Sequence, residues 1–266
     1  MCEKVKMVTV ITICLNEEKN IARTIESVLN QTYCNIEFIV KDGNSTDKSN
    51  EIIASYQNRF KKRGIRFIHL TGKDEGIYDA MNIALKEASG EWVNFMNAGD
   101  SFYDQNILKD VFQNKLWDDY GILYGHTLLE LANNYKFVQI NHHKRLLDGV
   151  GISQQVWFAR KELLDDFPFS KKYKILSDFD FLLKVQTAGV AFAPLNIIVA
   201  NYDRHGVSSK EVERIFLERK KILRKYNIHI PFSVRDKFIL KFKAIFTKCF
   251  PLYSDLLFCK HLSKFM

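Results

Sequence analysis

Short β-branched runs alternate with helical patterns along the first hundred residues. Apolar runs predict strands at 8–13, 36–40, 66–70 and 92–96. Between the first two, Ile21, Ile25, Val28 and Leu29 recur on one helical face, and further helices are expected around 52–56 and 77–88. This alternation predicts an α/β fold with a doubly wound, mostly parallel sheet, in which ligands bind beyond the carboxyl ends of the strands.

The predicted helices carry residues typical of helix ends. Asn16 is the expected N-cap of the first helix, with two glutamates in its first turn. Ser45 or Thr46 is expected to cap the second helix, and Gly90 to close the third as a C-cap.

Polar residues follow each of the four predicted strands. They are Asn16 and Glu17 after the first, Asp42 and Asp47 after the second, Asp74 after the third, and Asn97 to Asp100 after the fourth. Because parallel strands end at the same edge of a sheet, these side chains are expected at one rim.

The pattern weakens after residue 104. It predicts a helix near 104–115, strands near 121–124, 135–140 and 154–158, and a helix near 178–187. A basic helix near 211–226 precedes Pro231, and a boundary within 208–231 is expected. We therefore divide the chain into 1–208, with halves 1–104 and 105–208, and a basic helical tail, 209–266.

Charge singles out the tail. The 266 residues carry a formal net charge of +8, with 47% apolar content that suffices for one large core. Residues 209–266 hold 14 basic and 5 acidic side chains, a sum of +9 that accounts for the whole excess. The partner of this positive charge is therefore expected to meet the C-terminal segment.

Cysteine content and hydropathy indicate the cellular compartment of the protein. The five cysteines form no CxxC pair, so neither a zinc site nor a disulfide framework is suggested. The apolar run 8–15 is short for a secretory leader, and no uncharged stretch approaches 20 residues. We expect a cytoplasmic protein that does not span the membrane.

An amphipathic pattern lies within the tail. Val234, Phe238, Phe242, Ile245, Phe246 and Cys249 form one apolar helical face bordered by lysines. Such a face is typical of a helix lying in an anionic membrane interface, which predicts peripheral association with the inner face of the cell membrane. A helix packed on the rest of the protein, with lysines extending from its edge, is the alternative.

The carboxylates at the rim suit a nucleotide diphosphate. A divalent cation held by Asp100 would bridge diphosphate oxygens, and Asp42 would accept hydrogen bonds from a base or ribose. Either aspartate has a simpler alternative, because such a side chain after a strand often satisfies local backbone donors.

Four segments together resemble family 2 inverting glycosyltransferases with the GT-A fold. They are VTVITICLNEEKNIARTIESVLNQTY, IEFIVKDGNSTDKS, DEGIYDAMNIALKEASGEWVNFMNAGDSF and ILSDFDFLLK, in the order and spacing of that family across 8–184. The third is similar to the branch that builds bacterial surface polysaccharides. The resemblance implies a nucleotide diphosphate sugar donor, of which a UDP-sugar is the expected type, a Mn²⁺ or Mg²⁺ cofactor, and a lipid-linked or glycan acceptor.

The resemblance also implies donor-binding residues. Thr12, Asn16 and Glu17 would lie at the uridine pocket, and Asp42 at the base or ribose. Asp74, Asp79 and Asn82 would lie beside the donor sugar, and Asn97 is a further candidate, although Asp79 and Asn82 are also compatible with the solvated face of a helix. His205, in DRHGVSS, would contribute to the diphosphate or metal, or else be a surface or packing residue.

The metal motif of the family, Asp-x-Asp, falls on residues 98–100. Ala98 replaces the first aspartate, which leaves Asp100 as the expected ligand. Loss of one negative charge predicts that diphosphate oxygens hold much of the metal and that affinity for free metal is weak.

The catalytic base of the family is an aspartate in a Glu-Asp pair at the start of a helix. Ser177 and Asp178 occupy that place, so Asp178 is the expected general base, with Asp180 as its nearest competitor. A helix N-terminal charge without catalytic function is the alternative for Asp178. Trp157, with Gln154 and Gln155, would line the acceptor side, unless Trp157 belongs to the core.

Two alternatives from other classes remain. One is a nucleotide-sugar-binding protein without catalysis, since Ala98 removes a metal carboxylate. The other is a nucleic-acid-binding α/β protein, suggested by the basic tail. Because the tail charge borders an apolar face and no nucleic-acid motif is present, we expect no nucleic-acid partner. The oligomeric state is left open.

Overall fold

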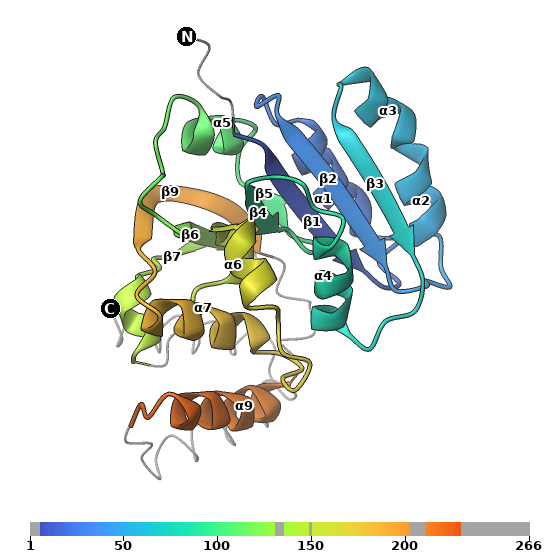
Figure 1. Cartoon of the computed structure of the whole chain (residues 1–266). Coiled ribbons are helices and arrows are strands. Elements are labelled where there is room, and N and C mark those ends of the chain that lie inside the picture. Colours follow the sequence, from blue (N-terminus) through green and yellow to red (C-terminus); the bar gives the residue numbers. More distant parts are fainter. Residues whose placement is uncertain (1–5, 131–135, 149–150, 203–210, 230–266) are drawn as a thin grey trace.

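A computed structural model describes residues 6–130, 136–148, 151–202 and 211–229. Within them nine strands form one sheet in the order β3-β2-β1-β4-β8-β6-β9-β5, with β7 paired to β6 (Figure 1). The strands are β1 (Val8–Cys14), β2 (Ile36–Asp42), β3 (Arg66–Thr71), β4 (Trp92–Phe95), β5 (Ser101–Phe102), β6 (Ile122–Glu130), β7 (Lys136–Gln139), β8 (Trp157–Arg160) and β9 (Phe192–Tyr202).

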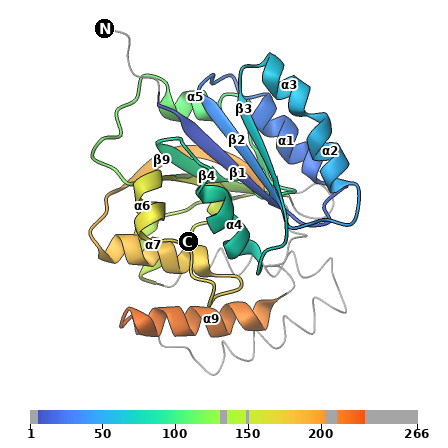
Figure 2. The same cartoon turned by 45° about the vertical axis from the view of Figure 1, so that its right-hand side comes forward.

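Helices cover the sheet and extend below it. They are α1 (Ile21–Leu29), α2 (Ser49–Ser55), α3 (Gln57–Lys62), α4 (Ile77–Leu85), α5 (Ile107–Phe112), α6 (Lys161–Asp166), α7 (Ser177–Thr187) and α9 (Val212–Lys225), with short 3-10 helices at His143–Leu146 and Gln154–Val156. The views in Figure 1 and Figure 2 place α1, α2 and α3 on one face of the first strands and α4 on the other.

The first half of the sheet is parallel, as predicted. β1 pairs in parallel with both β2 and β4, and β2 pairs with β3. Every residue of β2 is buried, because helices pack on both faces of these central strands. Along the sheet, β2 and β3 lie on one side of β1, and β4 lies on the other side. This change of direction in strand order places the carboxyl ends of β1 and β4 at a topological switch point.

The second half of the sheet is mixed. β8 is antiparallel to β4 and to β6, whereas β6 and β9 are parallel. The sequence pattern did not predict β9 or α6, and residues 154–156 form a 3-10 helix where a strand was expected. The register of β6 and β9 shifts between Tyr124 and His126, opposite the segment that contains Asn196 with φ of 54°.

Three predicted helix ends are wrong in detail. The N-cap of α1 is Asn20, and Asn16 lies earlier in a left-handed turn with φ of 55°. Helix α2 begins at Ser49, so neither Ser45 nor Thr46 is its cap. The Ser49 amide donates to the Asp47 carboxylate at 2.9 Å.

Gly90 was expected to close the helix that is now α4. Helix α4 ends at Leu85, so Gly90 is not its C-cap. A Cβ atom on Gly90 would lie 2.6 Å from the Thr9 nitrogen, which explains the glycine by its close approach to β1.

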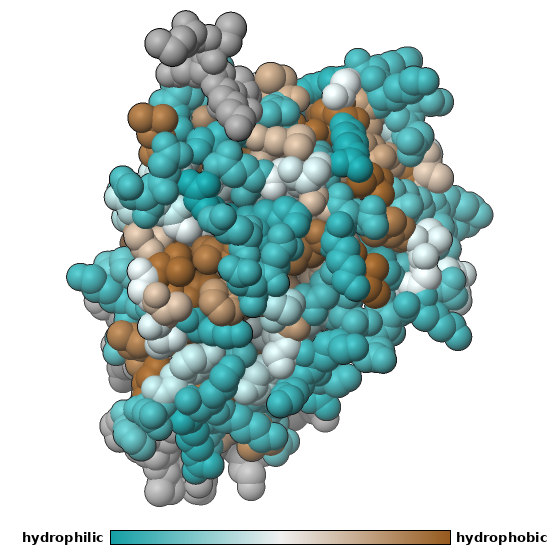
Figure 3. Space-filling view, viewed as in Figure 1, coloured by the Kyte–Doolittle hydropathy of each residue, from teal (hydrophilic) through white to brown (hydrophobic). Residues whose placement is uncertain are grey.

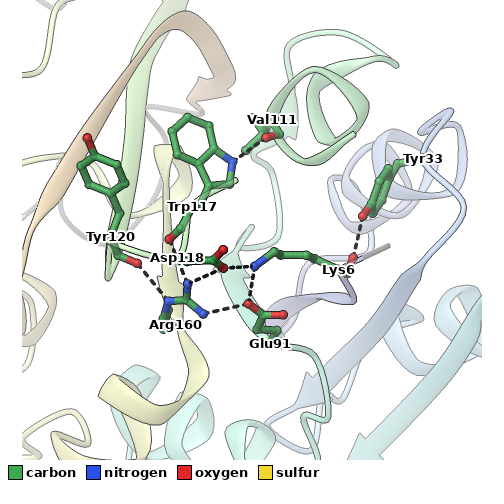
Figure 4. Close-up of polar contacts among 8 residues, drawn as sticks. All are labelled: Lys6, Tyr33, Glu91, Val111, Trp117, Asp118, Tyr120 and Arg160. Atoms are coloured by element: carbon green, nitrogen blue, oxygen red, sulfur yellow. Dashed lines mark hydrogen bonds and ion pairs between the residues drawn. The ribbon is translucent and has the colours of Figure 1, made fainter. Parts of the chain in front are cut away.

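An ion cluster closes the amino end of the sheet (Figure 4). Lys6, just before β1, contacts Glu91 at 2.9 Å and Asp118 at 2.8 Å. Arg160, at the end of β8, contacts Glu91 at 2.7 Å and donates to the Tyr120 carbonyl at 2.9 Å. These contacts join the first strand to β4 and β8.

Helix α9, the described part of the predicted tail, packs beside α7 (Figure 1). Ile222 and Leu223 are buried, and Lys225 forms an ion pair with Asp180 of α7 at 2.8 Å. The division at residue 208 stays a prediction. His205 and the predicted amphipathic segment from Val234 lie outside the described residues.

The visible surface gives no sign of a continuous apolar band. Figure 3 shows a face that is mostly hydrophilic, with apolar side chains in separate areas. Among the described residues, none of the helices combines the length and the apolar composition that crossing a membrane requires.

Candidate active site

A cavity of about 430 Å³ opens beyond the carboxyl ends of β1 and β4. The segments after β1, after β4 and before α7 contribute to its wall, together with the start of α4 and the turn before β8. Its lining residues are Ile13, Leu15, Glu17, Asn20, Ile77, Tyr78, Asn97, Ala98, Asp100, Ser153, Gln154, Gln155, Lys174, Ile175, Asp178 and Tyr202. The predicted rim is therefore the wall of a cavity, but only some of the predicted residues reach it.

Asp178 lies in the first turn of α7 and lines the cavity. The Tyr78 hydroxyl lies 2.8 Å from its Oδ1 atom. Burial raises the pKa of Asp178 to about 6, although the Tyr78 hydroxyl and the Phe179 amide stabilise the ionised form. A carboxylate with this pKa is a stronger base than an ordinary aspartate and is still mostly ionised at pH 7.

Tyr78 holds this carboxylate in place. Its hydroxyl also contacts the Ile175 carbonyl oxygen, so it touches α7 and the segment before it. Burial and the nearby Asp178 carboxylate raise the pKa of Tyr78 well above its ordinary value, so the phenol stays a hydrogen-bond donor. Tyr78 was part of the segment that suggested the family, yet the sequence alone gave it no role.

Asp100 lies in the turn after β4 and is only 5% exposed. Its Oδ2 atom accepts a hydrogen bond from the Gln155 side chain at 2.9 Å. Thr24 of α1 fixes the turn, because its hydroxyl donates to the Asp100 carbonyl at 2.7 Å and accepts from the Gly99 amide at 3.0 Å. Gly99 has φ of 98°, a conformation that favours glycine.

Asn97 lines the cavity and has one buried side-chain atom, Oδ1, without a hydrogen-bond donor among the described residues. Its Nδ2 atom donates to Gln154 at 3.3 Å. The Oδ1 atom is buried and accepts no hydrogen bond from any residue that the structure describes. A buried polar atom without a partner favours a ligand or water as its missing donor.

Glu17 lines the cavity, whereas Asn16 holds a neighbouring loop. The Asn16 side-chain oxygen accepts from the Thr46 backbone amide at 2.9 Å, and the Asn16 backbone amide donates to the Ser45 hydroxyl at 2.8 Å. The Glu17 carboxylate accepts from Asn20 at 2.8 Å. The two Asn16 bonds join the loops after β1 and β2.

Asp42 is fully buried and does not line the cavity. Its carboxylate accepts from the Ser45 amide at 2.7 Å and from Asn50 at 3.0 Å. Burial raises the pKa of Asp42, but these hydrogen bonds and that of the Ser45 hydroxyl outweigh it, so the pKa lies below its ordinary value. The Asp42 carboxylate thus holds the loop after β2, and its role in nucleotide binding stays a prediction.

The three polar residues expected beside the donor sugar have protein partners. Asp74 pairs with Lys41 at 3.0 Å. Asp79 accepts from the Glu75 amide at 2.9 Å and lies 3.3 Å from Lys171; the Glu75 amide first, and then Lys171, hold the pKa of Asp79 below its ordinary value.

Asn82, the third of them, binds backbone rather than solvent. Its side chain donates to the Phe169 carbonyl at 2.9 Å and accepts from the Phe169 amide at 3.0 Å. Asp74, Asp79 and Asn82 lie outside the cavity lining.

Thr12 and Trp157 belong to the core. Thr12 is fully buried, and its hydroxyl donates to the Met96 carbonyl at 2.6 Å. Trp157 is also fully buried, packed against Phe95 and Phe181. Trp157 therefore follows the core alternative, and its neighbours Gln154 and Gln155 line the cavity instead.

Asp180 is engaged elsewhere. It forms an ion pair with Lys225 at 2.8 Å and lines a second cavity of about 250 Å³ beside α9. This leaves Asp178 as the carboxylate of α7 that faces the larger cavity.

The donor set suits a cation that arrives with a phosphate ligand. In the part of the chain that the structure describes, no three His, Cys, Asp or Glu side chains come together as a metal site. The cavity presents the Asp100 carboxylate from the turn where the metal motif was expected. Since Mg²⁺ is commonly bound by one or two carboxylates plus substrate phosphates, Asp100 fits such a group when the diphosphate supplies the other ligands.

Comparison with known proteins identifies relatives. Residues 9–176 match the family model described as glycosyl transferase family 2. A protein of Mycobacterium tuberculosis named PGL/p-HBAD biosynthesis glycosyltransferase is 28% identical over 218 residues, which cover 80% of this chain and 83% of that protein. Glycosyltransferase GlyA of Streptococcus pneumoniae is 25% identical over 153 residues, 56% of this chain and 21% of that protein.

Solved structures share the fold at low identity. S. aureus TarS 1–349 in complex with UDP-GlcNAc has a TM-score of 0.66 and 18% identity, covering 90% of this chain and 71% of that one. The mannosyltransferase PcManGT of Pyrobaculum calidifontis, in complex with GDP-Man and Mn²⁺, has a TM-score of 0.64 and 16% identity, covering 95% and 73%. These likenesses confirm the expected GT-A fold.

Proposed function

The chain belongs to glycosyl transferase family 2, and from that premise we propose that its cavity binds a nucleotide diphosphate sugar and transfers the sugar to an acceptor hydroxyl with inversion. The observation that carries this proposal is that Asp100 and Asp178, from separate parts of the chain, line the same cavity. One carboxylate then serves the leaving diphosphate and the other serves the attacking hydroxyl.

Asp178 is the proposed general base. Inverting transfer is a single displacement: the acceptor oxygen bonds to the anomeric carbon as the bond to the diphosphate breaks, and the acceptor proton passes to a carboxylate. A pKa of about 6 suits Asp178 to this step near neutral pH. The Tyr78 hydroxyl orients the carboxylate and contributes to the wall beside it.

Asp100 is the proposed ligand of a divalent cation. A bound Mn²⁺ or Mg²⁺ would neutralise negative charge on the departing diphosphate. Gln155 donates to one Asp100 oxygen and so fixes the direction of the carboxylate. Glu17, Asn97 and Lys174 line the same cavity.

A UDP-sugar donor and a lipid-linked or polysaccharide acceptor complete the proposal. The TarS complexes with UDP and with UDP-GlcNAc support a UDP-sugar as the donor. Because PcManGT is in complex with GDP-Man, GDP-sugars are also tested as donors. A role in bacterial cell-surface glycan synthesis is supported by the mycobacterial relatives named for PGL/p-HBAD biosynthesis. Thr12, Asn16, Asp42, Asp74, Asp79 and Asn82 lie outside the lining of this cavity, and their part in donor binding stays a prediction.

The proposed site of action is the cytoplasmic face of the membrane. The basic, apolar pattern from Val234 onward motivates it. Flotation with anionic liposomes should carry the full chain upward and leave a chain ending at residue 229 behind. Equal behaviour of both proteins would remove the membrane from the proposal.

The function is tested by product chemistry. UDP-, GDP- and dTDP-sugars are offered with Mn²⁺ and a bacterial lipid extract, and released nucleotide diphosphate is measured. Magnetic resonance of the product then gives its anomeric configuration, which should be opposite to that of the donor. A product with retained configuration would contradict the assignment of Asp178 as base in a single displacement.

A nucleotide-sugar-binding protein without catalysis is the second candidate. Ala98, in place of the first metal carboxylate, favours it. Sugar transfer above the rate without protein would exclude it.

A further inference from the structure

A buried glutamate of α9 binds the backbone just before α7. Glu218 is 7% exposed. Its Oε1 atom accepts from the Lys174 amide at 2.8 Å, and its Oε2 atom accepts from the Ile175 and Leu176 amides at 3.0 and 3.1 Å. One carboxylate thus satisfies three consecutive backbone donors.

These donors lie at the start of the helix that carries Asp178. Leu176 is the N-cap of α7 and supplies no side-chain hydrogen bond to it. The amides at a helix start have no acceptor within the helix, and a glutamate near the helix start often reaches back to them. Here the glutamate comes from another helix, so the start of α7 is coupled to α9.

The same short segment is held from the opposite side. Tyr78 of α4 contacts the Ile175 carbonyl and the Asp178 carboxylate. Ile175 therefore donates its amide to Glu218, and its carbonyl oxygen shares the single Tyr78 hydroxyl proton with the Asp178 carboxylate. Lys174, Ile175 and Asp178 all line the cavity, so the position of this segment sets part of the cavity wall.

Helix α9 is itself fixed to the protein. Ile222 and Leu223 are buried, and Lys225 binds the Asp180 carboxylate at 2.8 and 3.0 Å. Glu218 and Lys225 thus hold α7 at two successive positions.

We propose that Glu218 is a positioning residue for the transfer reaction: it fixes the 174–178 turn so that Asp178 meets Tyr78 and faces the acceptor side of the cavity. The inference rests on the proposed function of Asp178. It assigns α9 a role in the active site, although α9 lies beyond residues 9–176, which match the family model.

The carboxylate chemistry of Glu218 makes the inference testable. Both of its oxygens accept, so glutamine keeps one acceptor and turns an amide N–H₂ group toward backbone donors. Alanine removes every bond. Glu213, on the same helix and exposed, provides the matched control as Glu213→Gln.

The experiment compares Glu218→Gln, Glu218→Ala and Glu213→Gln in the full chain. Donor turnover is followed by nucleotide diphosphate release, and donor affinity by calorimetry. Misplacement of a reacting group by about 1 Å can cost about 100-fold, so we expect kcat to fall about 10- to 100-fold in both Glu218 variants. Donor Kd and KM should stay within about threefold, since the nucleotide is held elsewhere in the cavity. Glu213→Gln should match the unaltered protein.

A double variant separates positioning from folding. In an Asp178→Asn background there is no base to position, so adding Glu218→Gln should leave the residual turnover unchanged. A Glu218→Gln kcat within twofold of the unaltered protein would overturn the inference. So would a further loss in the double variant, or loss of donor binding together with kcat.

The inference and the proposed function fail in different ways. Normal turnover of Asp178→Asn would contradict the proposed base. An inactive Asp178→Asn protein beside a normal Glu218→Gln protein would contradict only the positioning role.

Discussion

The two ends of the central sheet use the same kinds of charged residue in opposite ways. At the amino end, Lys6 and Arg160 meet Glu91 and Asp118, and each charge has a partner within 3 Å. At the carboxyl end, Asp100 and Asp178 face a cavity, and burial raises the pKa of Asp178 to about 6. The charges at the amino end pair with one another across neighbouring strands, whereas the two carboxylates at the other end line a cavity, where a perturbed pKa is typical of a functional site.

The largest expected effect comes from the carboxyl end. Asp178→Asn removes the proposed base and keeps the size of the side chain, so turnover should fall about 10²- to 10⁴-fold. Donor affinity should change little, because Asp178 is assigned to the acceptor. Steady-state kinetics beside calorimetry separates the two. Turnover near that of the unaltered protein would place the base elsewhere.

A smaller loss is expected at the other carboxylate of the cavity. Asp100→Asn should weaken donor binding and turnover about tenfold or more when Mn²⁺ is present, because a neutral amide is a poor ligand for a hard cation. The measurement is a Mn²⁺ titration of donor affinity in both proteins. An unaltered metal response would show that Asp100 is not a ligand.

The pH dependence gives a graded effect without any substitution. Folding raises the pKa of Asp178 from 3.8 to about 6, so the base becomes protonated as the pH falls through 6. Turnover should therefore decline about tenfold per pH unit well below pH 6 and level off above pH 7. A kcat profile that stays flat down to pH 5 would contradict this protonation state.

Asp178 affects stability in the opposite direction: as pH rises, turnover should increase, whereas the contribution of Asp178 to the free energy of unfolding should decrease. Between pH 4 and 6 the folded state holds a proton on Asp178 that the unfolded state has lost, so the contribution of this group to stability falls as pH rises. Since asparagine never ionises, the difference in unfolding free energy between Asp178→Asn and the unaltered protein should grow from pH 4 to pH 7 in favour of the variant. Urea unfolding at both pH values measures it.

The smallest effect on turnover is expected from the amino end. Arg160→Met removes the contacts to Glu91 and to two backbone carbonyls, and should cost about 1–3 kcal/mol of unfolding free energy. Turnover should remain within twofold where the protein is folded. Lys161→Met, which breaks the more exposed pair with Asp165, should cost under about 0.5 kcal/mol. Loss of turnover in folded Arg160→Met would contradict the view that the amino-end cluster contributes to stability and not to catalysis.

The strands of the amino-terminal half were predictable because each contains a run rich in apolar and β-branched residues. Buried parallel strands such as β1 and β2 read as β-branched runs, and their ends are set by polar turns. β9 was missed because Pro194 interrupts its pattern, and Asn196 has a left-handed conformation within it. A strand with such an irregularity depends on pairing with β6, which the local sequence does not encode.

The cavity was only partly predictable for a similar reason. Position after a strand identified Asp100 and Glu17, but the same rule applied to Asp42, whose carboxylate is buried against Ser45 and Asn50. The family resemblance identified Asp178. Tyr78 and Glu218 act through contacts with residues far away in the chain, and no local pattern reports such contacts.

The most direct measurement is calorimetry of UDP, GDP and dTDP with and without Mn²⁺, on the unaltered protein, Asp100→Asn and Asp178→Asn. We predict metal-dependent binding of one nucleotide, weakened by Asp100→Asn and retained by Asp178→Asn. Absence of binding by all three nucleotides, or equal binding by all three proteins with and without metal, would contradict the claim that this cavity is the donor site.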